Sequence, residues 1–454
     1  MDGVQTTEFD SPTQRAEIGK TRRAQTPRAA HAAWQPSSNR RDPIELLEES
    51  NAGRVAELIP IRYGRMSRSP FAFLRGSAAL MAYDLAATPV SGIQVQACGD
   101  CHLANFGLFA TPERNLIFDL NDFDETLPAP WEWDIKRLAA SFVVCGRDNG
   151  LSEADCEASV RILAQTYRSR LREYSQMRVL DVWYARIDDK MLIDNASNAE
   201  ARARRERIAA KARQSVGEYL YPKITSGESG SPRIIDQPPL IFHPANRLDE
   251  EGVKVVLDAY AATLAADRRK LLDRYRYVDY AFKVVGVGSV GTACFVVLFL
   301  AWDNDPLLLQ IKEARASVLE AYAGKSQYEH CGERVVVGQR LMQAASDMFL
   351  GWTTGPGGRH FYVRQLRDMK FSVPLTNMTG KDLARYAGVC AWALARAHAK
   401  GGDSAMIAGY LGKSDAFDPA LASFARAYAD QTARDHAALL KAIEDGRVQA
   451  IVDY

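Results

Sequence analysis

Two polar clusters lie close together in the first third of the chain, in 98-CGDCHLANFG-107 and 119-DLNDFDE-125. Their carboxylate and amide oxygens are hard ligands of the kind that Mg²⁺ takes, and aspartate and histidine also serve as general acids and bases. Short runs at 93–98 and 116–120 predict β-strands directly before the clusters. At these strand ends the clusters could hold a metal, contact phosphate or form only two turns.

A third candidate lies far along the chain in 286-GVGSVGT-292, between two apolar runs. Gly286, Gly288 and Gly291, with Ser289 among them, would let backbone amides approach phosphate oxygens closely. A dinucleotide-binding fingerprint needs a helix directly after the glycines, and here a second strand follows, so a Rossmann fold is excluded. A phosphate-covering turn and an ordinary glycine-rich β-turn remain as interpretations.

Lys312 lies in the apolar strand 307-LLLQIKEA-314, where a lysine is costly to bury unless an anion meets it. Glu329 and Glu333 follow one turn apart in an expected helix, 327–345, and either could pair with Lys312. A glycine-rich hairpin, a strand lysine and a helical glutamate together describe the nucleotide lobe of a protein-kinase-like fold. The tract 360–373 would then hold the last strand and the hinge.

Asp100 and Asn105 have the D-x-x-x-x-N spacing of a kinase catalytic loop, in which the aspartate is the base and the amide a magnesium ligand. The segment 98–107 resembles the catalytic loop of the aminoglycoside and choline kinase group, H-G-D-x-H-x-x-N, with Cys98 in place of the first histidine. This resemblance implies that Asp122 binds the second metal position. It also implies that Asp134 bonds back to the catalytic loop as a structural aspartate.

Several assignments stay open at this stage. Asp119 is the rival of Asp122 as metal ligand, because it also ends an apolar strand, and we prefer Asp122. His102 could be a ligand, an acid or base, or a structural hydrogen-bonding residue. Cys98 and Cys101 form a single C-x-x-C pair, so we expect no zinc there.

Composition places these motifs in an ordinary globular chain. The 454 residues are 47% hydrophobic and 25% charged, with a net charge of +1, so neither nucleic acid nor a membrane is an expected partner. Seven scattered cysteines favour a reducing, cytoplasmic location. We expect a disordered or draped arm at 1–42, a mainly helical catalytic lobe at 43–275, a β-rich nucleotide lobe with hinge at 276–375, and returning helices at 376–454.

The order of the motifs is the reverse of that in ordinary kinases, because the catalytic loop precedes the glycine-rich hairpin. The expected fold class is therefore α+β, a two-lobed protein-kinase-like fold that is circularly permuted. The segments 69-SPFAFLRG-76, 98-CGDCHLANFG-107, 118-FDLNDFDET-126, 131-WEWDIKRLAAS-141 and 286-GVGSVGT-292 resemble the uncharacterised bacterial family called domain of unknown function 2252. Arg65 and Arg75 belong to the motifs that carry this resemblance and could touch phosphate.

These residues predict an ATP- and Mg²⁺-dependent phosphotransferase that acts on an unidentified hydroxyl-bearing small molecule or protein. Asp100 would accept the proton, Asn105 and Asp122 would bind the metal, and Lys312 would hold the α- and β-phosphates. One alternative is a non-catalytic nucleotide-binding module, and another is an AMP transferase on the same fold. A phosphohydrolase built on Asp119, Asp122 and Asp124 would need neither the glycines nor Lys312.

Overall fold

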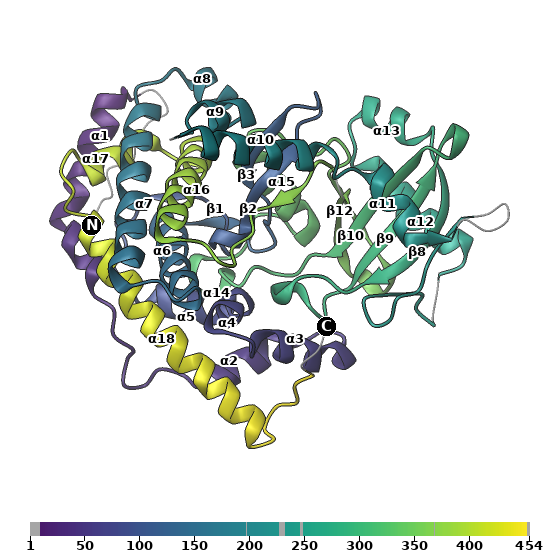
Figure 1. Cartoon of the computed structure of the whole chain (residues 1–454), viewed down its shortest axis with the longest axis horizontal. Helices are drawn as coiled ribbons and strands as arrows, with labels where there is room; N and C mark the ends of the chain where they lie inside the picture. Colours follow the sequence, from purple (N-terminus) through teal and green to yellow (C-terminus); the bar gives the residue numbers. More distant parts are fainter. Residues whose placement is uncertain (1–9, 197, 227–231, 246–247, 367, 452–454) are drawn as a thin grey trace.

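The structure is a computed structural model that describes residues 10–196, 198–226, 232–245, 248–366 and 368–451. It is mixed α+β, and its sheets are antiparallel. Long helices form one side of the molecule, a six-stranded sheet forms the other, and the chain's early helices run beneath both (Figure 1).

The described α-helices are α1 Pro12–Thr21, α2 Pro43–Ser50, α3 Ile59–Met66, α4 Pro70–Gly76, α5 Ala78–Ala86, α6 Trp131–Asp148, α7 Glu153–Tyr174, α8 Val179–Tyr184, α9 Asp189–Asp194, α10 Ala199–Arg213, α11 Gly217–Ile224, α12 Glu250–Ala262, α13 Ala266–Leu272, α14 Glu320–Ala323, α15 Cys331–Met342, α16 Gly380–Gly401, α17 Ser404–Leu411 and α18 Asp418–Glu444. The described strands are β1 Gln94–Ala97, β2 Phe106–Ala110, β3 Leu116–Leu120, β4 Leu127–Pro130, β5 Thr225–Ser226, β6 Arg233–Ile234, β7 Ile241–Phe242, β8 Arg276–Lys283, β9 Cys294–Leu300, β10 Pro306–Glu313, β11 Gly351–Thr354, β12 His360–Gln365 and β13 Phe371–Ser372.

The large sheet has the strand order β11-β12-β10-β9-β8-β7. The glycine-rich segment joins β8 to β9, and the next turn leads into β10, where Lys312 pairs with Cys294 of β9. This confirms the antiparallel hairpin. After β12 the chain crosses to the helical side, where β13 extends a three-stranded sheet of order β13-β2-β3. The polar clusters lie around this small sheet and the β1–β4 pair.

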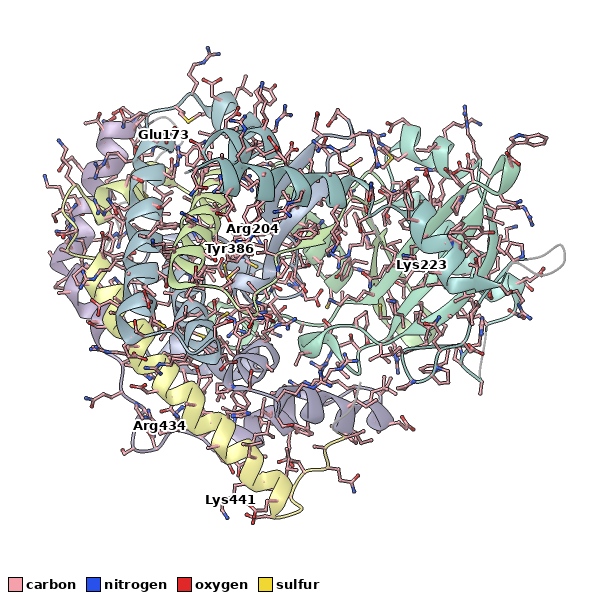
Figure 2. The ribbon with its side chains drawn as sticks, in the orientation of Figure 1. Glu173, Arg204, Lys223, Tyr386, Arg434 and Lys441 are labelled. Carbon is pink, nitrogen blue, oxygen red and sulfur yellow. The ribbon has the colours of Figure 1, made fainter. Side chains whose placement is uncertain are left out.

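The helical side is organised around α6, whose residues from Trp131 to Gly146 are all buried. Its neighbours α7, α16 and α18 pack through alanine, leucine and aromatic side chains, and α16 begins with a capping box formed by Thr379 and Asp382. The longest helix, α18, runs along the lower edge, with Arg434 and Lys441 exposed along it (Figure 2).

Two stretches whose apolar periodicity favours a single continuous helix are interrupted. The stretch 70–86 is divided into α4 and α5 at Ser77, whose backbone leaves the helical region at φ −115° and ψ 38°. The stretch 249–275 is divided into α12 and α13. In both cases the break lets two short amphipathic pieces pack in different directions, which a periodicity argument cannot detect.

The N-terminal segment holds more structure than the arm predicted for 1–42, although residues 1–9 of that arm lie outside the described residues. The helix α1 packs against α17 through two glycines. A Cβ at Gly19 would lie 1.9 Å from the Met406 carbonyl oxygen, and one at Gly409 would lie 2.0 Å from that of Ala16. The contact is therefore between backbones, and the weak apolar pattern of α1 did not reveal it.

In the described part of the chain, every helix is too short or too polar to cross a lipid bilayer.

Candidate functional site

A cavity of about 390 Å³ lies between the large sheet, the polar clusters and the early helices. Most of the predicted site residues line it, although they come from distant parts of the sequence. These are Asp100, His102, Asn105, Asp122, Gly286, Gly288, Ser289 and Lys312. The two polar clusters and the glycine-rich hairpin therefore belong to one site.

The loop 98–107 is fixed from behind by the helical side. Both carboxylate oxygens of Asp134 accept backbone N–H bonds, from Cys98 at 2.6 Å and Gly99 at 3.0 Å. His398 lies 3.1 Å from the same carboxylate. Tyr386 of α16, labelled in Figure 2, donates its hydroxyl to the Leu103 carbonyl at 2.8 Å. This confirms the expected structural role of Asp134.

Asp100 projects into the cavity while held by a buried arginine. Arg137 of α6 donates from Nε to Asp100 Oδ1 at 2.6 Å, and its Nη2 also contacts that oxygen. Burial raises the pKa of Asp100, and the charge of Arg137 opposes that rise. Asn105 Nδ2 donates to the Asp100 carbonyl oxygen at 2.8 Å, so the amide oxygen of Asn105 remains available as a ligand. Asp100 and Asn105 thus lie side by side, as their spacing predicts.

His102 is buried beside Asp100, with Nε2 at 3.8 Å from Asp100 Oδ2. Burial, together with the charges of Arg75 and Arg137, lowers its pKa well below the ordinary value. The imidazole is therefore neutral near pH 7, and its Nδ1 has no hydrogen-bond partner within the described structure. A neutral His102 can position its neighbours, but it cannot act as a positively charged group that binds an anion.

Lys312 is the buried cation of the site, and its partners are two aspartates of the second cluster. Its Nζ contacts Asp124 Oδ2 and lies 3.9 Å from Asp122 Oδ2. Tyr362 and Ser289 donate hydroxyls to Asp124 at 2.9 Å and 3.2 Å. A single carboxylate thus joins the helical side, the sheet and the glycine-rich turn.

The titration of these groups follows from their burial and mutual charges. Burial disfavours the ammonium of Lys312, but Asp122 and Asp124 outweigh it and raise the pKa of Lys312 well above its usual value. Burial likewise opposes ionisation of Asp124, yet Lys312 and the hydroxyl of Tyr362 hold its pKa below the ordinary value. The pKa of Asp122 is raised by burial and by the neighbouring charge of Asp124.

The expected pairing of Lys312 with Glu333 or Glu329 is not formed. Among the described residues, the ion pairs of Lys312 are with Asp122 and Asp124, and Glu329 is exposed. Glu333 lies in the first turn of α15 and is half-buried. The carboxylate that meets the lysine comes from the second polar cluster, which the sequence analysis had assigned to metal.

The physical reason lies in the face that α15 turns inward. Arg334 is 2% exposed, and it donates to the carbonyl oxygens of Thr126 at 2.5 Å, Asp124 at 2.7 Å and Arg315 at 2.8 Å. Successive helical residues point about 100° apart, so burying Arg334 turns Glu333 away from the cavity. In Figure 1, α15 lies between the helical side and the sheet. Its Arg334 binds the backbone of the second cluster through the Asp124 carbonyl oxygen.

Asp119, the rival metal ligand, lies outside the cavity. It is completely buried at the end of β3, and both of its carboxylate oxygens lie 2.8 Å from Nη2 of Arg396. The Ala344 N–H donates to the same carboxylate at 2.9 Å. Asp119 thus neutralises a buried arginine, and the preference for Asp122 agrees with the geometry.

The glycine-rich turn is supported by residues from the start of the chain. Arg54 donates to the carbonyl oxygens of Gly288 at 3.0 Å and Val290 at 2.5 Å, and the Val55 N–H donates to that of Gly291 at 2.8 Å. Gly291 has φ +86°, in the left-handed region that favours glycine. Arg65 donates to the Val285 carbonyl at 2.5 Å, so it supports the turn from outside the cavity lining.

Sequence reasoning missed several residues that shape the site. Arg54, Arg137, Arg334 and Tyr362 were not identified, and Asp124 entered only through the phosphohydrolase alternative. Three valines directly follow Arg334 in 332-GERVVVG-338, and an arginine beside such an apolar run signals a buried charge that could have indicated this residue. The others carry no local signal, because their partners lie far away in the sequence.

Comparison with known proteins gives one match. No curated protein and no solved structure matches the chain. A family model described as "Uncharacterized protein conserved in bacteria (DUF2252)" matches residues 54–442, which include every element around the cavity except α2 and the residues before it. The chain therefore belongs to the bacterial DUF2252 family.

Proposed function

We propose that the protein is an ATP- and Mg²⁺-dependent phosphotransferase with a permuted, protein-kinase-like arrangement. One observation carries the proposal: the glycine-rich turn and Lys312 meet Asp100, Asn105 and Asp122 across one cavity. Strand, glycine-rich turn, strand, strand lysine and helix follow one another in the order found in the nucleotide lobe of kinases. If the helical side and the large sheet were independently folding domains, the glycine-rich turn and Lys312 would not be expected to line the same cavity as Asp100 and Asp122.

The donor set suits a magnesium ion. Asp122 and the amide oxygen of Asn105 are the protein ligands, and Mg²⁺ usually takes one or two such ligands besides phosphate and water. Among the described residues, no three His, Cys, Asp or Glu side chains lie close enough together to hold a metal. The proposed ion would therefore take its remaining ligands from phosphate and water. When bound, the ion would neutralise charge on the phosphates.

The chain's own residues then have defined tasks in the proposed reaction. Lys312 exchanges Asp124 for the α- and β-phosphates, and backbone N–H groups of 286–291 cover the phosphates. Asp100 takes the proton from the acceptor hydroxyl while the oxygen of that hydroxyl bonds to the γ-phosphorus. The bond from that phosphorus to the β,γ-bridging oxygen breaks, and ADP leaves. In this view the Lys312–Asp124 contact belongs to the nucleotide-free state.

The test is calorimetry with ATP, with and without Mg²⁺, followed by turnover with γ- and α-labelled ATP. We expect Asp122→Ala to weaken Mg-ATP binding by about tenfold or more, the loss of one charge-assisted ligand. Asp258→Ala, which removes an exposed aspartate of α12, is the matched control and should bind like wild type. If the affinity for ATP is the same after the metal has been chelated, the proposal is refuted.

Asp100→Asn separates catalysis from binding, because it keeps the shape of the side chain but removes the base. We expect Mg-ATP binding to persist and label transfer to fall by at least about a hundredfold. Equal turnover would remove Asp100 from catalysis, whereas binding without turnover in the wild type would indicate a non-catalytic nucleotide module. Transfer of the α-label would identify an AMP transferase.

A further inference from the structure

Four arginines that line the cavity have no carboxylate partner among the described residues. We call Arg54, Arg62, Arg75 and Arg315 the arginine cluster. Arg54, Arg62 and Arg315 donate to backbone carbonyls, to Asn51 Oδ1 and to Ser50 Oγ, but none of them donates to a carboxylate within the described residues. Arg75 has no hydrogen bond to any described residue, and its Nε is buried without a partner.

The acidic residues of the same cavity are engaged elsewhere. Their partners are Arg137 for Asp100, Lys312 for Asp122 and Asp124, the Val318 N–H for Glu125, the Ala293 N–H for Glu313 and Arg41 for Glu49. Asp100 and Asp122 attract the Arg75 guanidinium without bonding to it. The positive charge of the cluster is therefore not neutralised by direct contact.

Burial makes this lack of compensation costly. Arg62 is 2% exposed, and its Nε has no partner in the described structure. Burial, together with the charges of Arg54 and Arg315, lowers the pKa of Arg62 to about 9. Buried arginines normally meet an anion, because an unpaired buried charge is strongly destabilising. Arg62 is buried and Arg54, Arg75 and Arg315 are half-buried, and a cavity lined by four such arginines is built for a ligand that supplies the negative charge.

We propose that the arginine cluster binds a phosphate-type oxyanion carried by the acceptor substrate, which makes the acceptor an anionic molecule. The assignment to an acceptor rests on the proposed phosphotransferase function. Guanidinium groups bind phosphate through paired N–H bonds, and a dianion balances several arginines better than a single carboxylate would.

Three of the four arginines reach the cavity from elements other than the strand that carries Lys312. Arg62 and Arg75 come from α3 and α4, and Arg54 from the turn before them, whereas Arg315 follows β10 three residues after Lys312. Arg54 donates to the carbonyl oxygens of Gly288 and Val290, and Ser289 of the same turn donates to Asp124, the partner of Lys312. The cavity therefore holds cations beyond Lys312 for a second anion.

The experiment is calorimetric titration of the full chain with inorganic phosphate, with chloride as the balancing anion at constant ionic strength. We expect saturable binding in the wild type, weakened about tenfold or more by Arg75→Gln. This variant should fold, because Arg75 makes no hydrogen bond in the described structure. Arg75→Lys, which keeps the charge, should recover part of the affinity. Arg178→Gln, which removes a charge exposed on the surface, should bind phosphate like wild type.

A second titration, in the presence of saturating Mg-ADP, decides which ligand the oxyanion belongs to. We expect the phosphate affinity to be unchanged, since ADP would occupy the Lys312 side. Loss of phosphate binding under Mg-ADP would overturn the proposal and assign the cluster to the nucleotide. No saturable phosphate binding, or equal binding by Arg75→Gln and wild type, would also overturn it. If Mg-ADP fails to bind at all, the proposed function fails, whereas the Arg75→Gln comparison still decides the anion site.

Discussion

At the scale of single residues, Glu125 is an acid whose pKa is raised by its position in the fold. Its carboxylate accepts the Val318 N–H at 2.7 Å and lines the cavity. Burial raises the pKa of Glu125 to about 7, although the Val318 N–H and the charge of Arg334 work against that rise. The neutral carboxyl is therefore the form that the folded state prefers.

This preference predicts a pH dependence with a definite sign. Because the folded pKa is raised, the stabilising contribution of Glu125 is complete below the unfolded pKa near 4.5 and is lost as pH rises through about 7. Between about pH 5 and about pH 8, the free energy of unfolding of the wild type should fall relative to Glu125→Gln by roughly 1–3 kcal/mol. Urea denaturation at each pH measures the difference. Glu200→Gln on α10 is the exposed control, and parallel profiles for Glu125→Gln and wild type would contradict the prediction.

At the scale of elements, the carboxylate that meets Lys312 comes from a loop and not from a helix. α15 packs Val335 and Val336 into the core of the helical side and clamps the second cluster with Arg334. The helix packs against α16 of the helical side and against β11 and β12 of the large sheet, and Arg334 fixes which of its faces meets the second cluster. Glu333, which precedes Arg334 in α15, has no side-chain partner among the described residues.

Two substitutions that each remove one negative charge test this arrangement. Asp124→Asn should lower the free energy of unfolding by about 2 kcal/mol or more, because Lys312 keeps only the more distant Asp122. Glu333→Gln should change it by less than about 0.5 kcal/mol, as expected for a half-exposed side chain without partners. Chemical denaturation of both variants gives the comparison. The reverse order of effects would restore the glutamate of α15 as the lysine's partner.

At the scale of the whole molecule, the two ends of the described chain wrap around the helical side. Figure 1 shows α1 and α17 together at one edge, with α18 running from there past the early helices. Ile451 returns to donate its N–H to the Pro60 carbonyl at 2.9 Å. The N-terminal and C-terminal segments are thus part of the packed structure.

The docking of α1 depends on the absence of a side chain at Gly19. Gly19→Val would place atoms where the Met406 carbonyl lies, so we expect α1 to detach and the free energy of unfolding to fall by roughly 1–3 kcal/mol. Limited proteolysis should then cut within 12–21, while Mg-ATP binding persists. Gly217→Ala, which meets no atom within 4 Å, is the control. Protection of 12–21 in the Gly19→Val variant would show that the contact is adaptable.

The sequence predicted local features of this fold well and long-range partners poorly. Spacing placed Asp100 beside Asn105, and the resemblance to the aminoglycoside and choline kinase group linked Asp134 to the loop 98–107, since those groups lie on one short stretch or one adjoining helix. The glycine hairpin and Lys312 were also placed correctly within the sheet. The partner of Lys312 was predicted wrongly, because two acidic stretches, 119–125 and 329–333, could supply it. Only the orientation of α15 decides which of them meets the lysine. Circular permutation and ATP chemistry stay predictions.

The Lys312–Asp124 contact also has a kinetic consequence. It joins residues 188 positions apart, and Tyr362 reaches the same carboxylate across 238 positions. Contacts of such separation close only after long loops have been ordered, which slows folding relative to proteins rich in local contacts. On a ribosome, Asp100 and Asp122 emerge well before Lys312 and Tyr362 exist. Asp122 and Asp124 must therefore lack their lysine partner until β10 has been synthesised, and the helical side is completed only when α16 and α18 follow the sheet.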